Sequence, residues 1–64
     1  MTPGEVRERW PYLTDAQAAA VLLLERGLSI RAIARTLGIT PSAVRDRLDG
    51  AEQRVLRHEQ REAA

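Results

Sequence analysis

Arginines are the residues of this chain whose type and spacing suit recognisable chemistry. All ten basic residues are arginine, and five of them lie between positions 26 and 47. These five are Arg26, Arg31, Arg35, Arg45 and Arg47. Asp46 is the single acidic residue of that segment, which therefore carries a net charge of +4, whereas the whole chain carries +1. Guanidinium groups bind phosphate oxygens and can hydrogen-bond guanine in a bidentate manner, so this segment is predicted to contact nucleic acid.

The rest of the sequence narrows the range of functions. Residues 1–25 carry a net charge of −2 and residues 48–64 carry −1, which predicts a local electrostatic footprint and a modest affinity per copy. His58 is the only histidine and cysteine is absent, so we expect no metal ligands and no disulfide. We also find no glycine-rich phosphate loop and no nucleophile–base pattern, so we expect neither catalysis nor a cofactor.

Residues 29–48 have the pattern of two short helices joined by a tight turn. The i, i+3, i+4, i+7 spacing of a buried helical stripe is formed by Ile30, Ile33, Ala34 and Leu37. Gly38 follows where a left-handed residue commonly ends a helix. Thr40 and Pro41 suit the N-cap and first position of the next helix. The pattern predicts a helix-turn-helix, whose second helix can enter the major groove of DNA.

The predicted helices are 15–26, 30–37 and 41–58. Thr14 and Gln17 form a capping-box pattern before the first of them. Its nearly continuous apolar content predicts that this helix is the most buried. A glycine inside a helix costs about 1 kcal/mol relative to alanine, so Gly50 is a possible break. The apolar spacing continues across it, through Val44, Leu48, Ala51 and Val55, and favours a single long helix.

These elements predict a compact all-α fold of three to four helices in one domain spanning residues 1–64. Residues 1–12 and 59–64 are expected to be partly loose, apart from a helical turn near Glu5–Trp10. The longest apolar run, 16–24, is too short to cross a membrane. The first ten residues lack the apolar core of a signal peptide, so we expect a cytoplasmic protein without a membrane partner.

The stretch from about Tyr12 to Arg57 resembles the promoter-reading region 4 of extracytoplasmic-function sigma factors. Related patterns occur in LuxR-type regulators and in the DNA-binding domains of recombinases and transposases. The resemblance is carried by Leu13, Gln17, Val21, Leu23, Leu24, Gly27, Leu28, Ser29, Ile33, Ala34, Leu37, Gly38, Ile39, Val44, Arg47, Leu48 and Ala51. It departs at Ala32, where the sigma branch often has an acidic residue. We expect no room in 64 residues for the domain with which a sigma factor opens promoter DNA.

The leading hypothesis is a small sequence-specific DNA-binding protein, a prokaryotic or phage-borne transcriptional regulator with helix 41–49 in the major groove. The candidate contacts to double-stranded DNA are Arg31, Arg35, Thr40, Ser42, Ala43, Arg45, Asp46 and Arg47. Arg31 and Arg35 are expected to hold phosphates, and Arg45 and Arg47 to read bases. A solvated face with an Arg45–Asp49 ion pair is the competing interpretation.

Two further hypotheses remain open. One is an adaptor that contacts RNA polymerase or an anti-sigma partner, and the other is the DNA-anchoring part of a recombinase or transposase. A single recognition helix covers only a half-site, so we also expect a homodimer. Its seam would be the segment Trp10–Leu13 or the apolar row Leu48, Ala51, Val55 and Leu56. The same row could instead cover the helix at 15–26.

Overall fold

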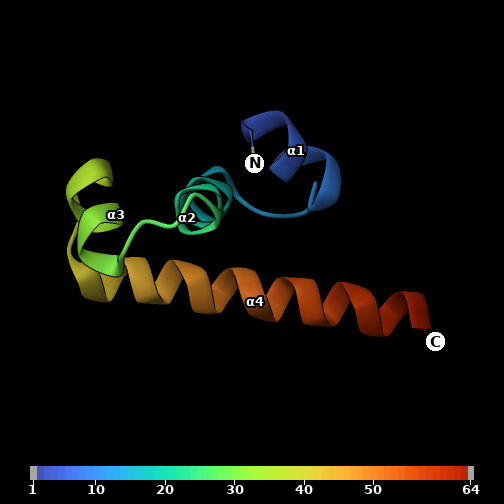
Figure 1. Cartoon of the computed structure of the whole chain (residues 1–64). Coiled ribbons are helices and arrows are strands. Elements are labelled where there is room, and N and C mark those ends of the chain that lie inside the picture. Colours follow the sequence, from blue (N-terminus) through green and yellow to red (C-terminus); the bar gives the residue numbers. More distant parts are fainter. Residues whose placement is uncertain (1, 64) are drawn as a thin grey trace.

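The computed structural model describes residues 2–63, and four helices account for most of them (Figure 1). They are α1 (Pro3–Arg9), α2 (Asp15–Glu25), α3 (Ile30–Leu37) and α4 (Pro41–Ala63). No strand occurs among these residues, and the predicted all-α fold is confirmed. None of the described helices is both long and apolar enough to span a membrane.

Side-chain caps explain where the helices begin. Thr14 Oγ1 accepts a hydrogen bond from the Gln17 backbone N–H, and Gln17 Oε1 accepts one from the Thr14 N–H, each at 3.1 Å. Ser29 Oγ accepts from the Ala32 N–H at 3.2 Å at the start of α3. Such caps satisfy backbone donors that have no partner within the helix. The predicted starts at 15, 30 and 41 are therefore confirmed.

The N-terminal segment is more ordered than the sequence predicted. Thr2 and Glu5 form a capping box, and Pro3 occupies the first helical turn, where its missing N–H costs nothing. The resulting helix α1 starts earlier than the turn expected near Glu5–Trp10. Val6, which sequence reasoning did not single out, is 1 % exposed and packs with Leu13 in the core. Burial of this side chain holds α1 against α2.

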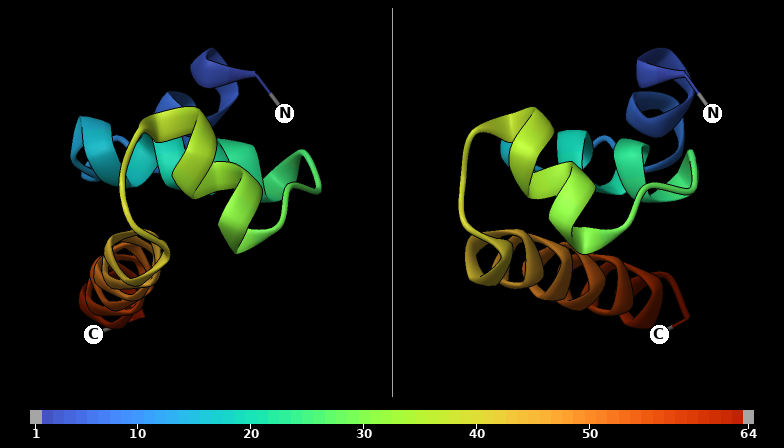
Figure 2. Two further views of the ribbon diagram at one scale, coloured as in Figure 1. Left: turned by 90° about the vertical axis from the view of Figure 1, so that its left-hand side faces the viewer. Right: turned by 60° about the vertical axis from the view of Figure 1, so that its left-hand side comes forward.

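Three helices lie on one side of α4, with α2 between α3 and α1 (Figures 1 and 2). The core has two parts. One cluster joins α3 to the first turns of α4 through Ile33, Ala34 and Val44. The other joins α1, α2 and the middle of α4 through Val6, Leu13, Ala18 and Ala51. Helix α4 therefore belongs to both clusters.

Helix α2 is less buried than its composition suggested. Only Ala18 and Ala20 are buried; Val21, Leu22 and Leu23 are half-buried, and Leu24 is exposed. An apolar helix needs neighbours on all sides to be fully buried. Here α1, α3 and α4 cover three sides, and the side that carries Leu24 stays open. Only four of its eleven residues are nevertheless exposed, a share similar to the three of eight in α3 and smaller than in α1 or α4, so the expectation that this helix is the most buried is not contradicted.

Helix α4 is continuous through Gly50 and extends five residues past the expected end at 58. A Cβ atom built on Gly50 would lie 2.9 Å from the Gln17 Nε2 atom, so a side chain of α2 lies close against α4 here. The glycine is therefore explained by this close approach rather than by a break. Near the C-terminus, His58 Nε2 lies 3.0 Å from Glu62 Oε1 one turn later. This contact supports a turn that the sequence placed in the loose tail.

Candidate nucleic-acid interface

The turn between α3 and α4 has the backbone geometry that the sequence predicted. Gly38 adopts a left-handed conformation, with φ of 69° and ψ of 35°, and ends α3. The Ile39 N–H donates to the Ala34 carbonyl at 3.0 Å, which closes the turn. Thr40 Oγ1 then accepts from the Ala43 N–H at 3.1 Å and caps α4. Figure 2 shows the short connection 38–40 running from the end of α3 to the start of α4.

Apolar contacts fix the angle between the two helices. Ile33 and Val44 are both 0 % exposed and belong to one cluster. Packed against it are Leu23, Leu28, Ile30, Leu37, Ile39 and Leu48. Because the buried side chains come from both helices, the first turns of α4 rest on a packed base. A base of this kind orients the outward side chains of 41–49.

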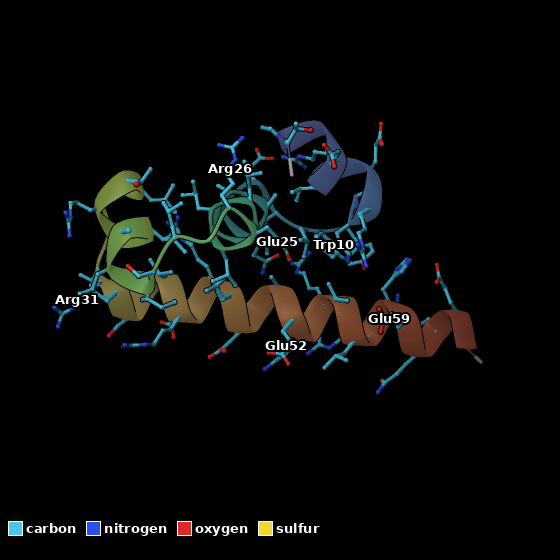
Figure 3. All side chains as sticks on the ribbon, viewed as in Figure 1. Trp10, Glu25, Arg26, Arg31, Glu52 and Glu59 are labelled. Carbon is cyan, nitrogen blue, oxygen red and sulfur yellow. The ribbon has the colours of Figure 1, made fainter. Side chains whose placement is uncertain are left out.

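Most of the predicted contact residues are exposed. Arg31, Arg35, Thr40, Ser42, Arg45 and Asp46 are exposed, whereas Ala43 and Arg47 are half-buried. Arg31 and Arg35 are one turn apart on α3, and Figures 1 and 3 show α3, with Arg31, at the same end of the molecule as the first turns of α4. The structure therefore brings cations from α3 and α4 to the same end of the molecule.

The three charged residues 45–47 point in different directions. Successive residues of an α-helix are separated by about 100°, so Arg45 and Arg47 lie on opposite flanks of α4. Asp46 lies between them on the side opposite the buried Val44. A helix in the major groove turns its outer side to base edges, and long side chains on its flanks can reach either base edges or backbone phosphates. This arrangement allows Asp46 to accept from a cytosine amino group while the arginines reach to either side.

The structure specifies the role of Thr40 and bears on the competing interpretation of the charged residues as an ion pair. The Thr40 hydroxyl oxygen accepts the N-cap bond from the Ala43 N–H, and its O–H stays available to donate to a phosphate. The competing Arg45–Asp49 ion pair is absent from the interactions of the described residues 2–62. Contacts between charged or ionisable side chains in this part of the chain include Arg7 with Asp15 and His58 with Glu62, both away from the turn.

The anchors of the C-terminal half of α4 were not predicted. The Tyr12 and His58 rings stack with centroids 4.1 Å apart, and Arg54 Nη1 donates to the Tyr12 carbonyl at 3.0 Å. Burial raises the pKa of the Tyr12 hydroxyl above its usual 10.0, and the Glu59 and Glu62 carboxylates add to the shift. These contacts join residues more than 40 positions apart, so no local sequence pattern could predict them. They hold the helix on which the candidate interface is built.

Nothing in the described residues suggests a metal centre, because no three His, Asp or Glu side chains converge there.

No curated protein and no solved structure gives a significant match to the chain. A family model described as a Homeodomain-like domain matches residues 12–55, which include α2, α3 and the first part of α4. This match favours DNA binding in general and does not single out sigma region 4. The chain belongs to the homeodomain-like family of helix-turn-helix domains.

Proposed function

We propose that the protein binds DNA sequence-specifically, with residues 41–49 of α4 in the major groove, as a prokaryotic or phage-borne transcriptional regulator. The observation that carries the proposal is the placement of four exposed or half-exposed arginines around a packed helix-turn-helix. Family membership supports it, because the third helix of a homeodomain reads the major groove. Within the matched residues 12–55, α4 is the third helix after α2 and α3, and it therefore corresponds to the third helix of a homeodomain.

The proposed roles follow from side-chain chemistry. Arg45 and Arg47 hydrogen-bond guanine, and each bidentate pair discriminates against a wrong base by about 1–3 kcal/mol. Ala43 presents its methyl group to a thymine methyl. Arg31 and Arg35 lie on α3, outside the inserted helix, and hold phosphates, which sets the register of α4 without reading sequence. Regulation would follow from occupancy, since a bound domain blocks or recruits another protein at the same site.

The test first selects target sequences from random duplex DNA and then compares four variants by gel shift at several salt concentrations. Arg45→Ala and Arg47→Ala should weaken binding to the selected site by about 10-fold or more and relax the preference at one position each. Arg31→Ala and Arg35→Ala should weaken binding to all sequences and lower the salt slope by about one each. Arg57→Ala is the control, because Arg57 is exposed on α4 about two turns beyond the reading segment.

Parent-like binding by all four variants would show that the DNA-contact assignment is wrong. The adaptor alternative predicts instead that random duplex DNA binds weakly and without salt dependence. The recombinase or transposase alternative predicts DNA binding like that of the regulator. It is distinguished by a longer reading frame that carries a catalytic domain.

Homodimerisation on repeated half-sites stays a prediction of its own, and the structure reduces the apolar surface available for it. Of the row expected to form the seam, Ala51 is buried and Leu48 and Val55 are half-buried against the core clusters. Leu56 alone is exposed. Half-sites on one face of the duplex would be about 10–10.5 base pairs apart, or a multiple of that. Sedimentation of the protein with and without its selected DNA tests this prediction, and a monomer in both states would refute it.

A further inference from the structure

An apolar groove lies between α2 and α4, on a side of the molecule that the proposed DNA contacts do not use. Leu13, Val21, Leu48 and Val55 contribute to its floor, and Trp10 lies at one end. Leu24 on α2 and Leu56 on α4 form the two lips. They are 46 % and 49 % exposed, and they are the two large hydrophobic residues that are exposed among the described residues. Together with the apolar floor they form a contiguous apolar surface, and such a surface with a polar rim can mark an interaction site.

The charged residues that line the groove have the same sign, whereas the Arg9 guanidinium lies over the Trp10 ring at one end of it, 4.9 Å from the ring centroid. Asp49 and Glu52 are the charged residues that line it. Glu25 follows Leu24 directly, and Figure 3 shows Glu25 on α2 above Glu52 on α4, with Trp10 to one side. An apolar floor between carboxylates is complementary to a ligand with apolar anchors and basic flanks. It also repels DNA phosphates, so this side stays separate from the proposed DNA contacts.

The shape of the groove favours a helix as the ligand. Its floor and lips come from two packed helices, and the described residues contain no sheet edge to which a strand could be added. Along α4, the groove runs from Leu48 to Leu56, which is about 12 Å at 1.5 Å per residue. Anchors at i, i+4 and i+7 of a docked helix span about 10.5 Å, which matches this length.

A second copy of this chain fits the groove poorly. A two-fold pair would place the same surface on both sides, so it would bring a second set of carboxylates to the groove and no lining cation to pair with Asp49 and Glu52. Like charges opposed across an interface disfavour that partner. We therefore propose that the α2–α4 groove binds a basic amphipathic helix of another protein, with apolar residues between Leu24 and Leu56 and cations against Asp49 and Glu52.

The test uses synthetic helical peptides without tryptophan and follows the fluorescence of Trp10, the only tryptophan of the chain and part of the groove. The first peptide carries leucine at i, i+4 and i+7 with lysine on both flanks. The second replaces each lysine by glutamate, and the third replaces each leucine by alanine. Because the contact is small, binding of the first peptide is expected in the micromolar range, near the weak end of protein interfaces.

Only the first peptide should bind, and substitutions in the groove should weaken its binding. Leu56→Gln should weaken binding by about 10-fold, because it removes an apolar lip that is half-exposed and not needed for the core. Asp49→Asn with Glu52→Gln should weaken it by roughly 3- to 10-fold and remove its salt dependence, since exposed ion pairs are individually weak. Arg57→Gln is the matched control next to Leu56 and should change nothing, because Arg57 lines a different cavity.

Several outcomes would overturn the proposal. Equal binding of the lysine and glutamate peptides would remove the charge complementarity. Parent-like binding by Leu56→Gln would place the peptide elsewhere. A protein that self-associates in sedimentation, and loses this on Leu56→Gln, would make a second copy the occupant. The proposal does not depend on DNA binding: Arg45→Ala and Arg47→Ala should keep full peptide affinity, so its failure and that of the DNA assignment are distinguishable.

Discussion

Replacing Gly50 by alanine tests whether the crossing of α2 and α4 explains this glycine. In a helix without neighbours the change should stabilise the helical state by about 1 kcal/mol, because alanine is the better helix former. In this protein the new methyl group would lie 2.9 Å from Gln17 Nε2, closer than carbon and nitrogen atoms can pack. The Gln17 side chain must therefore move.

Movement of Gln17 has a cost that the structure identifies. Gln17 Oε1 accepts the hydrogen bond from the Thr14 N–H that completes the capping box of α2. A hydrogen bond of this kind contributes about 0.5–1.5 kcal/mol. The gain in helix propensity and the loss of the cap are therefore similar in size. We expect Gly50→Ala to change the free energy of unfolding of the parent protein by less than about 0.5 kcal/mol.

A double-mutant cycle with Gln17→Ala tests directly whether the Gln17 side chain opposes the gain from Gly50→Ala. Gln17→Ala alone should destabilise by about 0.5–1.5 kcal/mol, because the reciprocal bond of the capping box is lost. In that background Gly50→Ala should stabilise by about 1 kcal/mol, since the obstacle is gone. Urea unfolding followed by circular dichroism measures all four proteins, and the coupling energy between the sites should be about 1 kcal/mol.

Two results would refute this reasoning. A gain of about 1 kcal/mol from Gly50→Ala in the parent protein would mean that Gln17 yields without cost. An equal destabilisation in both backgrounds would mean that another neighbour, rather than Gln17, excludes the methyl group. Gln53→Ala, an exposed change on the same helix, serves as the control for helix propensity alone.

Three further predictions concern the core, the turn and the C-terminal anchor. Ile33→Ala should destabilise by about 2–5 kcal/mol, enough to unfold much of a domain this small, as circular dichroism would show. Gly38→Ala should cost about 1–2 kcal/mol, because φ is positive there, and should lower the melting temperature by about 4–8 °C per kcal/mol; an unchanged melting temperature would contradict this. Because the pKa of Tyr12 is raised in the folded protein, its contribution to stability is present below pH 10.0 and lost as pH rises through the folded pKa. Glu62→Gln should bring the pKa of this single tyrosine closer to 10.0 in an absorbance titration, and an unchanged pKa would rule out the carboxylate as a cause.

Much of the helix-turn-helix could be predicted because its determinants are local. Gly38, Thr40 and Pro41 specify the turn by their own backbone preferences, and the spacing of Ile33 and Leu37 identifies the inner side of α3. These signals act within one or two helical turns. For the same reason the exposed positions of Arg31, Arg35 and Arg45 followed directly from the sequence.

The structural features that the sequence did not predict depend on contacts between residues far apart in the chain. The burial of Val6 depends on how α1 turns back onto α2, and a single valine in a polar segment gives no periodic signal. The Tyr12–His58 stack joins the two ends of the chain. In α2 the apolar residues surround the whole helix, so no pattern could show that Leu24 stays exposed while Ala20 is buried.

The order of charges along α4 limits how DNA can lie against it. Arg45 and Arg47 belong to the part of the helix that the cluster around Ile33 and Val44 fixes. Asp49 and Glu52 follow within the next two turns and border the apolar groove. Phosphates running along the helix axis would meet these carboxylates, whereas phosphates crossing the first turns would meet arginines on both flanks and on α3. Under the proposed function, a duplex is therefore favoured across the first turns of α4 that precede Asp49, which would restrict one copy to a few base pairs and leave the later turns of α4 to the proposed protein partner.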